Sequence, residues 1–284
     1  MTSDPFLRVH IQGAGKIGRA FATALRKARW PVRLQSARRG RPRQVDADVV
    51  LLTVRDSQLL EEANAWVPIV PSHAVVLHAA GALEPRVLSV LRSRCRGIGQ
   101  LHPLISVVDT RGGIRFEGAY ALIAGNRKAC QCATQIARVV GMHPWRNHHL
   151  DRATYHAAAG LMAGGTAALF YAATHILVQA GIAPRKAQHM LVPLLRSVAD
   201  NIEHVGVPRA LSGVIRRGDV VTLRNHIEKL SSTAPRHLSL YLAASYTQLE
   251  MARQLGDTSE NNLLDVERLI AASRGSEALL LRES

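Results

Sequence analysis

The sequence predicts an α/β domain built on a parallel, doubly wound sheet, followed by an all-helical domain. Apolar runs alternate with helical patterns through the first half of the 284-residue chain, and strand patterns stop after Asp151. A glycine-rich turn also joins the first apolar run to the first helical pattern. Strands separated by helices form parallel sheets that are covered on both faces. We therefore place one domain at residues 1–150 and a second at 151–284.

Each expected element follows from the spacing of apolar residues and from the residues that interrupt it. Six apolar runs predict strands at 7–11, 32–35, 49–54, 75–79, 97–101 and 120–123. Helical periodicity predicts helices at 19–28, 57–66 and 131–140, the last of them ended by Gly141. In the second half it predicts helices at 152–180, 184–204, 220–230 and 238–255, followed by a polar loop at 257–262.

Composition restricts the class of protein. Hydrophobic residues make up 47% of the chain and charged residues 20%, which is typical of a globular protein. The three cysteines lack the paired spacing of zinc sites, so we expect reduced thiols, no metal and a cytoplasmic location. The net charge of +15 suggests nucleic-acid binding. The basic residues are spread along the chain and aromatic residues are only 4%, so we expect no nucleic-acid partner.

One segment is long enough to cross a membrane. Residues 153–184 contain no Asp, Glu, Lys or Arg, and a spanning helix needs about 20 apolar residues. However, Ala, Gly and Thr dominate the segment, and polar side chains such as His156 and Gln179 point in different directions around the helix. We therefore expect a helix buried on all sides within the protein, and no membrane partner.

The glycine-rich turn carries the main chemical signature of the chain. It reads Gly13, Ala14, Gly15, Lys16, Ile17 and Gly18, directly after a predicted strand and at the start of a helix. In this context the first glycine permits a tight turn, the second lets a pyrophosphate approach the backbone, and the third allows close helix–strand packing. The free amides of the helix N-terminus then favour the diphosphate. This pattern indicates a Rossmann-type dinucleotide-binding domain, the alternative being a purely structural turn.

The residues after the second predicted strand indicate which dinucleotide is bound. An NAD-binding domain usually has an acidic residue there, which binds the ribose hydroxyls. This chain instead has Ser36, Arg38 and Arg39, and a hydroxyl with guanidinium groups can bind a 2′-phosphate by charge-assisted hydrogen bonds. We therefore predict NADP as the cofactor. The alternative is an exposed basic loop with no ligand.

Further polar and small residues follow later strands, where α/β sheets bind their ligands. Thr53 and Val54 end the third strand, and Ala80 and Gly81 end the fourth, leaving room for the nicotinamide ribose. Histidine can exchange a proton with a substrate near neutral pH. The candidate catalytic residues are His102 after the fifth strand, His156 near the start of the first long helix, and Asn201 on the next helix. For His102, a structural role in capping a loop is the alternative.

These motifs together resemble the family that joins a Rossmann-like domain to a helical domain of unknown function, DUF2520. The resemblance runs from about Leu7 to Leu255. Besides the glycine turn, it rests on the segments 50–56, 77–83, 101–104, 155–159, 194–196 with 201–202, and 211–219. The family is similar to two-domain reductases such as pyrroline carboxylate reductase, ketopantoate reductase and prephenate dehydrogenase. The resemblance implies hydride transfer with NADP, a small-molecule substrate and a homodimer formed through the helical domain.

The chain departs from the family pattern at several positions. Arg55 stands where proline is usual, residues 105–107 replace Gln, Thr and Phe, and Gly164–Gly165 replace a Ser-Asn pair. The leading hypothesis is an NADP-dependent oxidoreductase that reduces a small carbonyl or imine, with His102 and His156 polarising or protonating the reacting atom. Because two glycines offer no side chain to a substrate, the alternative is a non-catalytic NADP-binding sensor or partner protein.

Overall fold

The computed structural model describes residues 6–108, 116–147 and 149–280 of the chain. Within it the chain divides into two compact units, residues 1–163 and residues 164–284. The boundary falls inside a long helical run, whereas the sequence placed it before that run, at residue 150. Each unit has its own hydrophobic core.

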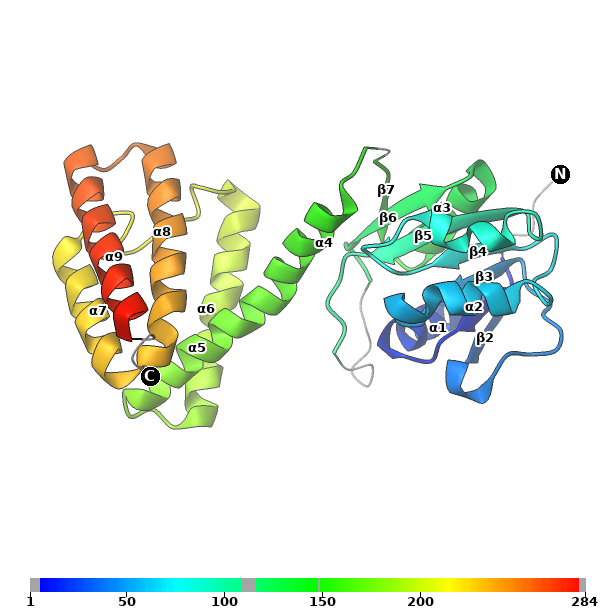
Figure 1. Cartoon of the computed structure of the whole chain (residues 1–284), viewed down its shortest axis with the longest axis horizontal. Helices are drawn as coiled ribbons and strands as arrows, with labels where there is room; N and C mark the ends of the chain where they lie inside the picture. The colour runs from blue at the N-terminus through cyan, green and yellow to red at the C-terminus, as the bar shows by residue number, and fades with distance from the viewer. Residues whose placement is uncertain (1–5, 109–115, 148, 281–284) are drawn as a thin grey trace. The chain divides into compact units, whose positions relative to one another are not determined.

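The first unit contains a seven-stranded sheet (Figure 1). Its strands are β1 (Val9–Gln12), β2 (Val32–Gln35), β3 (Val49–Leu52), β4 (Val75–His78), β5 (Gly97–Pro103), β6 (Tyr120–Gly125) and β7 (His143–Trp145). The order across the sheet is β2-β1-β3-β4-β5-β6-β7, and β1 to β5 are parallel. The predicted parallel sheet is confirmed for these five strands, whereas β6 runs antiparallel to β5.

Helices cover both faces of this sheet, so the predicted doubly wound α/β class is confirmed. The helices that cover it are α1 (Lys16–Lys27), α2 (Leu59–Trp66) and α3 (Arg127–Val139), with a 3₁₀ helix at Pro85–Leu91. Helix α4 (Arg152–Gly160) follows β7. Phe21 of α1 and Ile136 of α3 pack on one face with Leu51, while Trp66 of α2 packs on the other with Leu52. Alternate residues of a strand point to opposite faces, so one apolar run supplies both cores.

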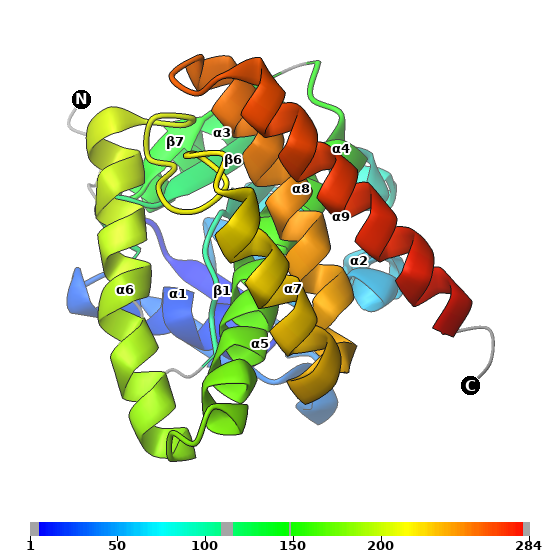
Figure 2. The ribbon, with the colours of Figure 1, turned by 90° about the vertical axis from the view of Figure 1, so that its left-hand side faces the viewer.

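The second unit is all-helical, as predicted. Its helices are α5 (Thr166–Gln179), α6 (Pro184–Val205), α7 (Val220–Thr233), α8 (Leu238–Leu255) and α9 (Glu260–Leu280). Helices α7, α8 and α9 pack together around Leu223, Leu242, Leu249 and Val266 (Figure 2). Between α4 and α5 a single π-helical turn, Leu161–Gly165, contains both glycines of the Gly164–Gly165 pair.

The sequence predicted that the apolar helical run Arg152–Gln179 is buried on all sides, but most of it is exposed. It is the one helix of the described residues that is long and apolar enough to cross a membrane, yet only 6% of its most apolar window is buried. In α5 only Ala172 and Thr174 are buried, and in α6 only Ala187, among the described residues. The chain therefore leaves much of the apolar surface of these two helices uncovered.

The first βα turn is packed too closely for any residue but glycine at position 18. A Cβ there would lie 1.9 Å from the carbonyl oxygen of Gly13 and 2.6 Å from Thr53 Oγ1. At Gly15, by contrast, a Cβ would meet no described atom within 4 Å. The same motif therefore contains one glycine fixed by packing and one that faces open space.

This contrast predicts different effects of the same substitution on stability. Gly18→Ala is expected to lower the free energy of unfolding by about 1–3 kcal/mol or more, the usual cost of overpacking. Gly15→Ala should lower it by less than about 1 kcal/mol, since only the N-cap preference of glycine is lost. Urea denaturation of both variants measures the difference. Equal losses would contradict the packing argument.

Candidate functional site

The candidate site begins where the chain leaves β1. Gly13 adopts a left-handed φ of 118°, and its amide donates to the carbonyl of Gln35 over 2.8 Å. Thr53, which follows β3, donates its hydroxyl to the Gly13 carbonyl over 2.7 Å. The turn is thus fixed between β2 and β3, on either side of β1. In a sheet of this order, the gap between β1 and β3 is the point where parallel sheets bind ligands.

The turn presents unpaired backbone donors to solvent. Gly15 is the N-cap of α1, and no side chain of the described residues caps the helix by a hydrogen bond. No acidic residue lies in the first turn of α1. A helix N-terminus of this kind attracts an anion through its free amides and its dipole. Because Gly15 is exposed and its missing side chain would occupy open space, the turn fits a pyrophosphate group.

A hollow of about 670 Å³ opens beside this turn, and we call it the β1–β2 hollow. Seven of the residues predicted to bind the cofactor line it: Gly13, Ala14, Gly15, Ser36, Arg38, Thr53 and Val54. Its other lining residues are Arg19, Ala37, Arg41, Arg55, Gln58, Glu61 and Glu62. Arg39 is exposed at the end of the 3₁₀ turn Ala37–Arg39 and does not line the hollow. Arg19 and Arg55 were not predicted as ligand-binding residues.

A second hollow of about 420 Å³, the β4–β5 hollow, continues from the first. Thr53, Val54 and Arg55 line both hollows, so the two form one groove along the carboxyl ends of the strands. The remaining lining residues of the second hollow are Lys16, Ile17, Ala79, His102, Pro103, Ile105 and Val107. Its lining is less polar than that of the first hollow, and a histidine stands at its end. The groove therefore joins a cationic pocket to a pocket that contains a titratable side chain.

His102 is held in a defined tautomer. Its Nδ1 lies 2.9 Å from the carbonyl oxygen of Ala79, which can only accept, so Nδ1 carries the hydrogen. Burial lowers the pKa of His102 below the usual value, partly offset by this hydrogen bond and reinforced by nearby His156. The imidazole is therefore neutral near pH 7, and its Nε2 offers a lone pair.

His102 and His156 meet above Gly81. A Cβ at Gly81 would lie 2.8 Å from His102 Nε2 and 2.8 Å from His156 Cδ2. The absence of a side chain at Gly81 is what allows both imidazoles to approach this point. The ring of Tyr155 stands edge-on to His102 at a centroid distance of 5.9 Å, and burial raises the pKa of its hydroxyl. The structure thus brings together the two histidines that the sequence predicted 54 positions apart.

A polar network fixes the start of α4 against the sheet. Gln100 of β5, fully buried, donates to the carbonyls of Ala80 and Leu83, and it accepts a hydrogen bond from Arg152 Nη1. Burial lowers the pKa of Arg152. The network therefore ties α4, which carries His156, to β5, which carries His102. Neither Gln100 nor Arg152 was predicted from the sequence.

The other predicted site residues are placed as follows. Ala80 and Gly81 are buried in the loop after β4 and line neither hollow, although Ala79 lines the second. Gly18 is buried beneath the glycine turn. Asn201 is exposed on α6 of the second unit. Among the residues that the structure describes, no group of three or more His, Cys, Asp and Glu side chains could hold a metal ion.

Comparison with known proteins agrees with this architecture. Residues 119–248 match the family model described as a domain of unknown function, DUF2520, which confirms the resemblance over that segment. No curated protein sequence matches the chain.

Solved structures share the fold at low sequence identity. A candidate NADP oxidoreductase of Bacteroides fragilis has a TM-score of 0.72 and 17% identity, covering 87% of this chain and 99% of its own. A protein of Thermotoga maritima has a TM-score of 0.64 and 20% identity, with 87% and 98% covered. Pyrroline carboxylate reductase of Plasmodium falciparum, solved with NADP bound, has a TM-score of 0.56 and 12% identity, with 96% and 99% covered.

Proposed function

We propose that this protein is an NADP-dependent oxidoreductase that reduces a small carbonyl or imine compound. The observation that carries the proposal is the single groove that runs from the uncapped glycine turn to His102, whose imidazole meets that of His156 at Gly81. The turn fits a diphosphate, and the second hollow has room for a nicotinamide ring beside His102. One similar structure is described as a candidate NADP oxidoreductase and another as a reductase with NADP bound, which supports the same class.

The preference for NADP rests on the residues after β2. This strand ends at Gln35, so no carboxylate stands where it would bind ribose hydroxyls and repel a 2′-phosphate. Ser36 and Arg38 line the β1–β2 hollow, and Ser36 makes no side-chain cap bond to the following turn. Its hydroxyl and the Arg38 guanidinium are thus placed to donate to a phosphate. Arg19 and Arg55 add positive charge along the same hollow.

The chemistry of the chain itself lies in binding, orientation and proton transfer. Bound NADPH would supply the hydride, and the protein has to hold a substrate beside it and provide a proton. In the fixed tautomer of His102, Nε2 can accept a hydrogen bond from an N–H or O–H group of the substrate and so orient it. His156 is exposed and can exchange protons with solvent, so we assign it the transfer to the carbonyl oxygen or imine nitrogen.

The alternative function is a non-catalytic NADP-binding sensor or partner protein. One observation favours this alternative: Gly164 and Gly165, in the π-helical turn Leu161–Gly165, offer no polar side chain to a substrate. Single π-helical turns inside α-helices often occur at functional sites. Asn201, the third predicted catalytic residue, remains a proposal on the second unit. Turnover with a carbonyl or imine substrate distinguishes the enzyme from the sensor.

We also propose that the protein forms a homodimer through its helical unit. Met190, Leu194, Val198, Ile202 and Val205 of α6 are exposed and recur at spacings of three and four residues, which places them along one face of the helix. They form an apolar stripe of a kind that a soluble monomer would rarely leave uncovered. A second copy of the same unit presents a matching surface.

The cofactor assignment predicts a selective loss. Arg38→Ala should weaken NADPH binding by about tenfold or more, the loss of one charge-assisted hydrogen bond, and leave NADH binding nearly unchanged. Calorimetric titration of wild type and variant with both dinucleotides measures this. A wild-type preference for NADH would sink the NADP assignment, and equal losses for both dinucleotides would remove Arg38 from the phosphate site.

The proton-transfer assignment predicts a catalytic loss. His156→Ala should slow substrate-dependent oxidation of NADPH by about 100-fold or more, the usual contribution of a general acid. His73→Ala is the control, because His73 is exposed just before the amino end of β4, whereas His102 lies near the carboxyl end of the parallel neighbouring strand β5. Unchanged turnover in the His156 variant would refute its role. Tight NADPH binding without oxidation across keto acids, imines and hydroxy acids would favour the sensor.

The dimer proposal predicts a change of mass in solution. The wild-type protein should sediment as a dimer of the 30.9 kDa chain, and Leu194→Asp should convert it to a monomer by placing a charge in the apolar interface. Arg268→Glu, on the exposed surface of α9, should leave the dimer intact. Sedimentation velocity distinguishes these states. A wild-type monomer at micromolar concentration, or a wild type that needs detergent to stay soluble, would rule the proposal out.

A further inference from the structure

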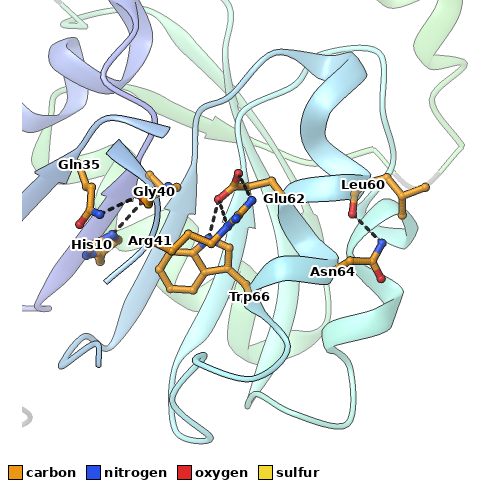
Figure 3. Close-up of polar contacts among 9 residues, drawn as sticks. His10, Gln35, Gly40, Arg41, Leu60, Glu62, Asn64 and Trp66 are labelled. Atoms are coloured by element: carbon orange, nitrogen blue, oxygen red, sulfur yellow. Dashed lines mark hydrogen bonds and ion pairs between the residues drawn. The ribbon is translucent and has the colours of Figure 1, made fainter. Parts of the chain in front are cut away.

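The loop after β2, which carries Ser36 and Arg38, is fixed at its far end. Gly40 adopts a left-handed φ of 73°, and its carbonyl oxygen accepts from two glutamines. Gln35 Nε2 donates to it over 2.9 Å (Figure 3). Gln12 Nε2 donates to it over 3.3 Å. Gln12 lies on β1 and is fully buried. The sheet itself therefore holds the end of this loop.

The next residue is anchored to helix α2. Arg41 donates from Nε and Nη2 to the two carboxylate oxygens of Glu62, over 2.9 and 2.8 Å. Glu62 is only 6% exposed and also accepts from Trp66 Nε1 over 2.9 Å. This bidentate geometry is the strongest form of an arginine–carboxylate pair. Figure 3 shows the Arg41 fork pointing to the Glu62 carboxylate, away from Gly40.

The contacts continue from α2 back to β1. The rings of Trp66 and His10 lie 5.2 Å apart, and His10 Nε2 lies 3.4 Å from Gln12 Oε1. His10, Gln12 and Trp66 are all buried. These contacts form a closed circuit that joins β1, the loop and α2. Of its two charged side chains, that of Glu62 is buried and that of Arg41 is 30% exposed.

We propose that Glu62 is a positioning residue for cofactor selectivity, acting through Arg41. By holding Arg41, the buried carboxylate fixes the 36–41 loop so that Ser36 and Arg38 face a 2′-phosphate. In this proposal Arg41 stabilises the conformation of the loop and does not bind the phosphate. The inference rests on the proposed NADP function, and it separates Arg41 from Arg38 in the basic cluster after β2.

The opposite assignment would be that Arg41 binds the phosphate directly. Arg41 lines the β1–β2 hollow, as Arg38 does, so its position is compatible with this alternative. In that case Glu62 would compete with the phosphate for Arg41 and would repel it, since both are anions. Removing the charge of Glu62 would then strengthen NADPH binding. If Glu62 positions the loop, the same change weakens NADPH binding, so the sign of the effect separates the two roles.

The test is the binding of NADPH and NADH to Glu62→Gln. The expected result is about tenfold weaker NADPH binding, as one charge-assisted bond to the phosphate is lost, with NADH binding unchanged. The unchanged NADH affinity shows that the variant folds and keeps its groove. Tighter NADPH binding in this variant would overturn the proposal, and so would equal losses for both dinucleotides.

Glu61→Gln is the matched control. Glu61 is the neighbouring residue, lines the same hollow and is exposed, so its substitution removes the same charge without breaking the circuit. It should leave NADPH binding unchanged or strengthen it slightly, by removing a repulsion. If Glu61→Gln and Glu62→Gln both weaken NADPH binding equally, the positioning role of Glu62 is refuted.

A double-variant cycle identifies the path of the effect. Arg41→Met should weaken NADPH binding about as much as Glu62→Gln, and the double variant should be no worse than either single one. Additive losses would show that Arg41 contacts the phosphate itself and would overturn the proposal. If wild-type protein binds neither dinucleotide, the proposed function fails as a whole. If the wild-type protein prefers NADPH but the variants do not show the expected losses of NADPH binding, only the inference about Glu62 fails.

Discussion

A Cβ at Gly18 would lie 1.9 Å from the carbonyl oxygen of Gly13, so helix α1 can cross the end of β1 only because no side chain stands between them. This approach lets Thr53 of the neighbouring strand bond the Gly13 carbonyl over 2.7 Å. The turn is therefore held from both sides, and the first amides of α1 point into the groove. The site depends on this packing because a displaced helix would move its N-terminus away from the ligand.

The electrostatics of the groove follow from how the basic residues after β2 are used. The chain carries a net charge of +15, and the sequence places Arg38, Arg39, Arg41 and Arg43 close together. In the structure Arg38 lines the β1–β2 hollow, Arg39 does not, and Arg41 is paired with the buried Glu62. Charges farther than a Debye length are screened, and paired charges are largely cancelled by their partners. The affinity of this hollow for an anion therefore depends on the few unpaired cations nearby and not on the net charge of the chain.

Sequence patterns predicted the elements well, because each depends on local spacing. The strand at Val32–Gln35 and the helix at Leu238–Leu255 have the predicted bounds, and the fingerprint glycines lie at the first βα turn. The direction of β6 could not be predicted, since an apolar run reads the same in a parallel or an antiparallel pair. The short strand His143–Trp145 was missed because three residues carry no periodicity.

Other features depend on contacts between residues far apart in sequence. The Arg41–Glu62 pair spans 21 positions and the Arg152–Gln100 pair spans 52, and no local motif joins either. The exposure of α5 and α6 was mispredicted for a related reason. An apolar, uncharged run shows that a surface has to be covered, but it does not show whether the same chain, a second copy or a lipid covers it.

The histidines show how the fold sets chemistry that composition leaves open. Burial lowers the pKa of His78 to about 3 and lowers those of His10 and His102. These imidazoles stay neutral beside the positive charge of Arg152, which acts on His78 and His102, and of Arg33, which acts on His10. Each favours the folded state fully above the unfolded pKa of about 6.5, and that contribution falls as the pH drops toward the folded pKa. The hydrogen bond of Nδ1 to the Ala79 carbonyl fixes the tautomer of His102 as well, so its Nε2 keeps a lone pair beside Gly81.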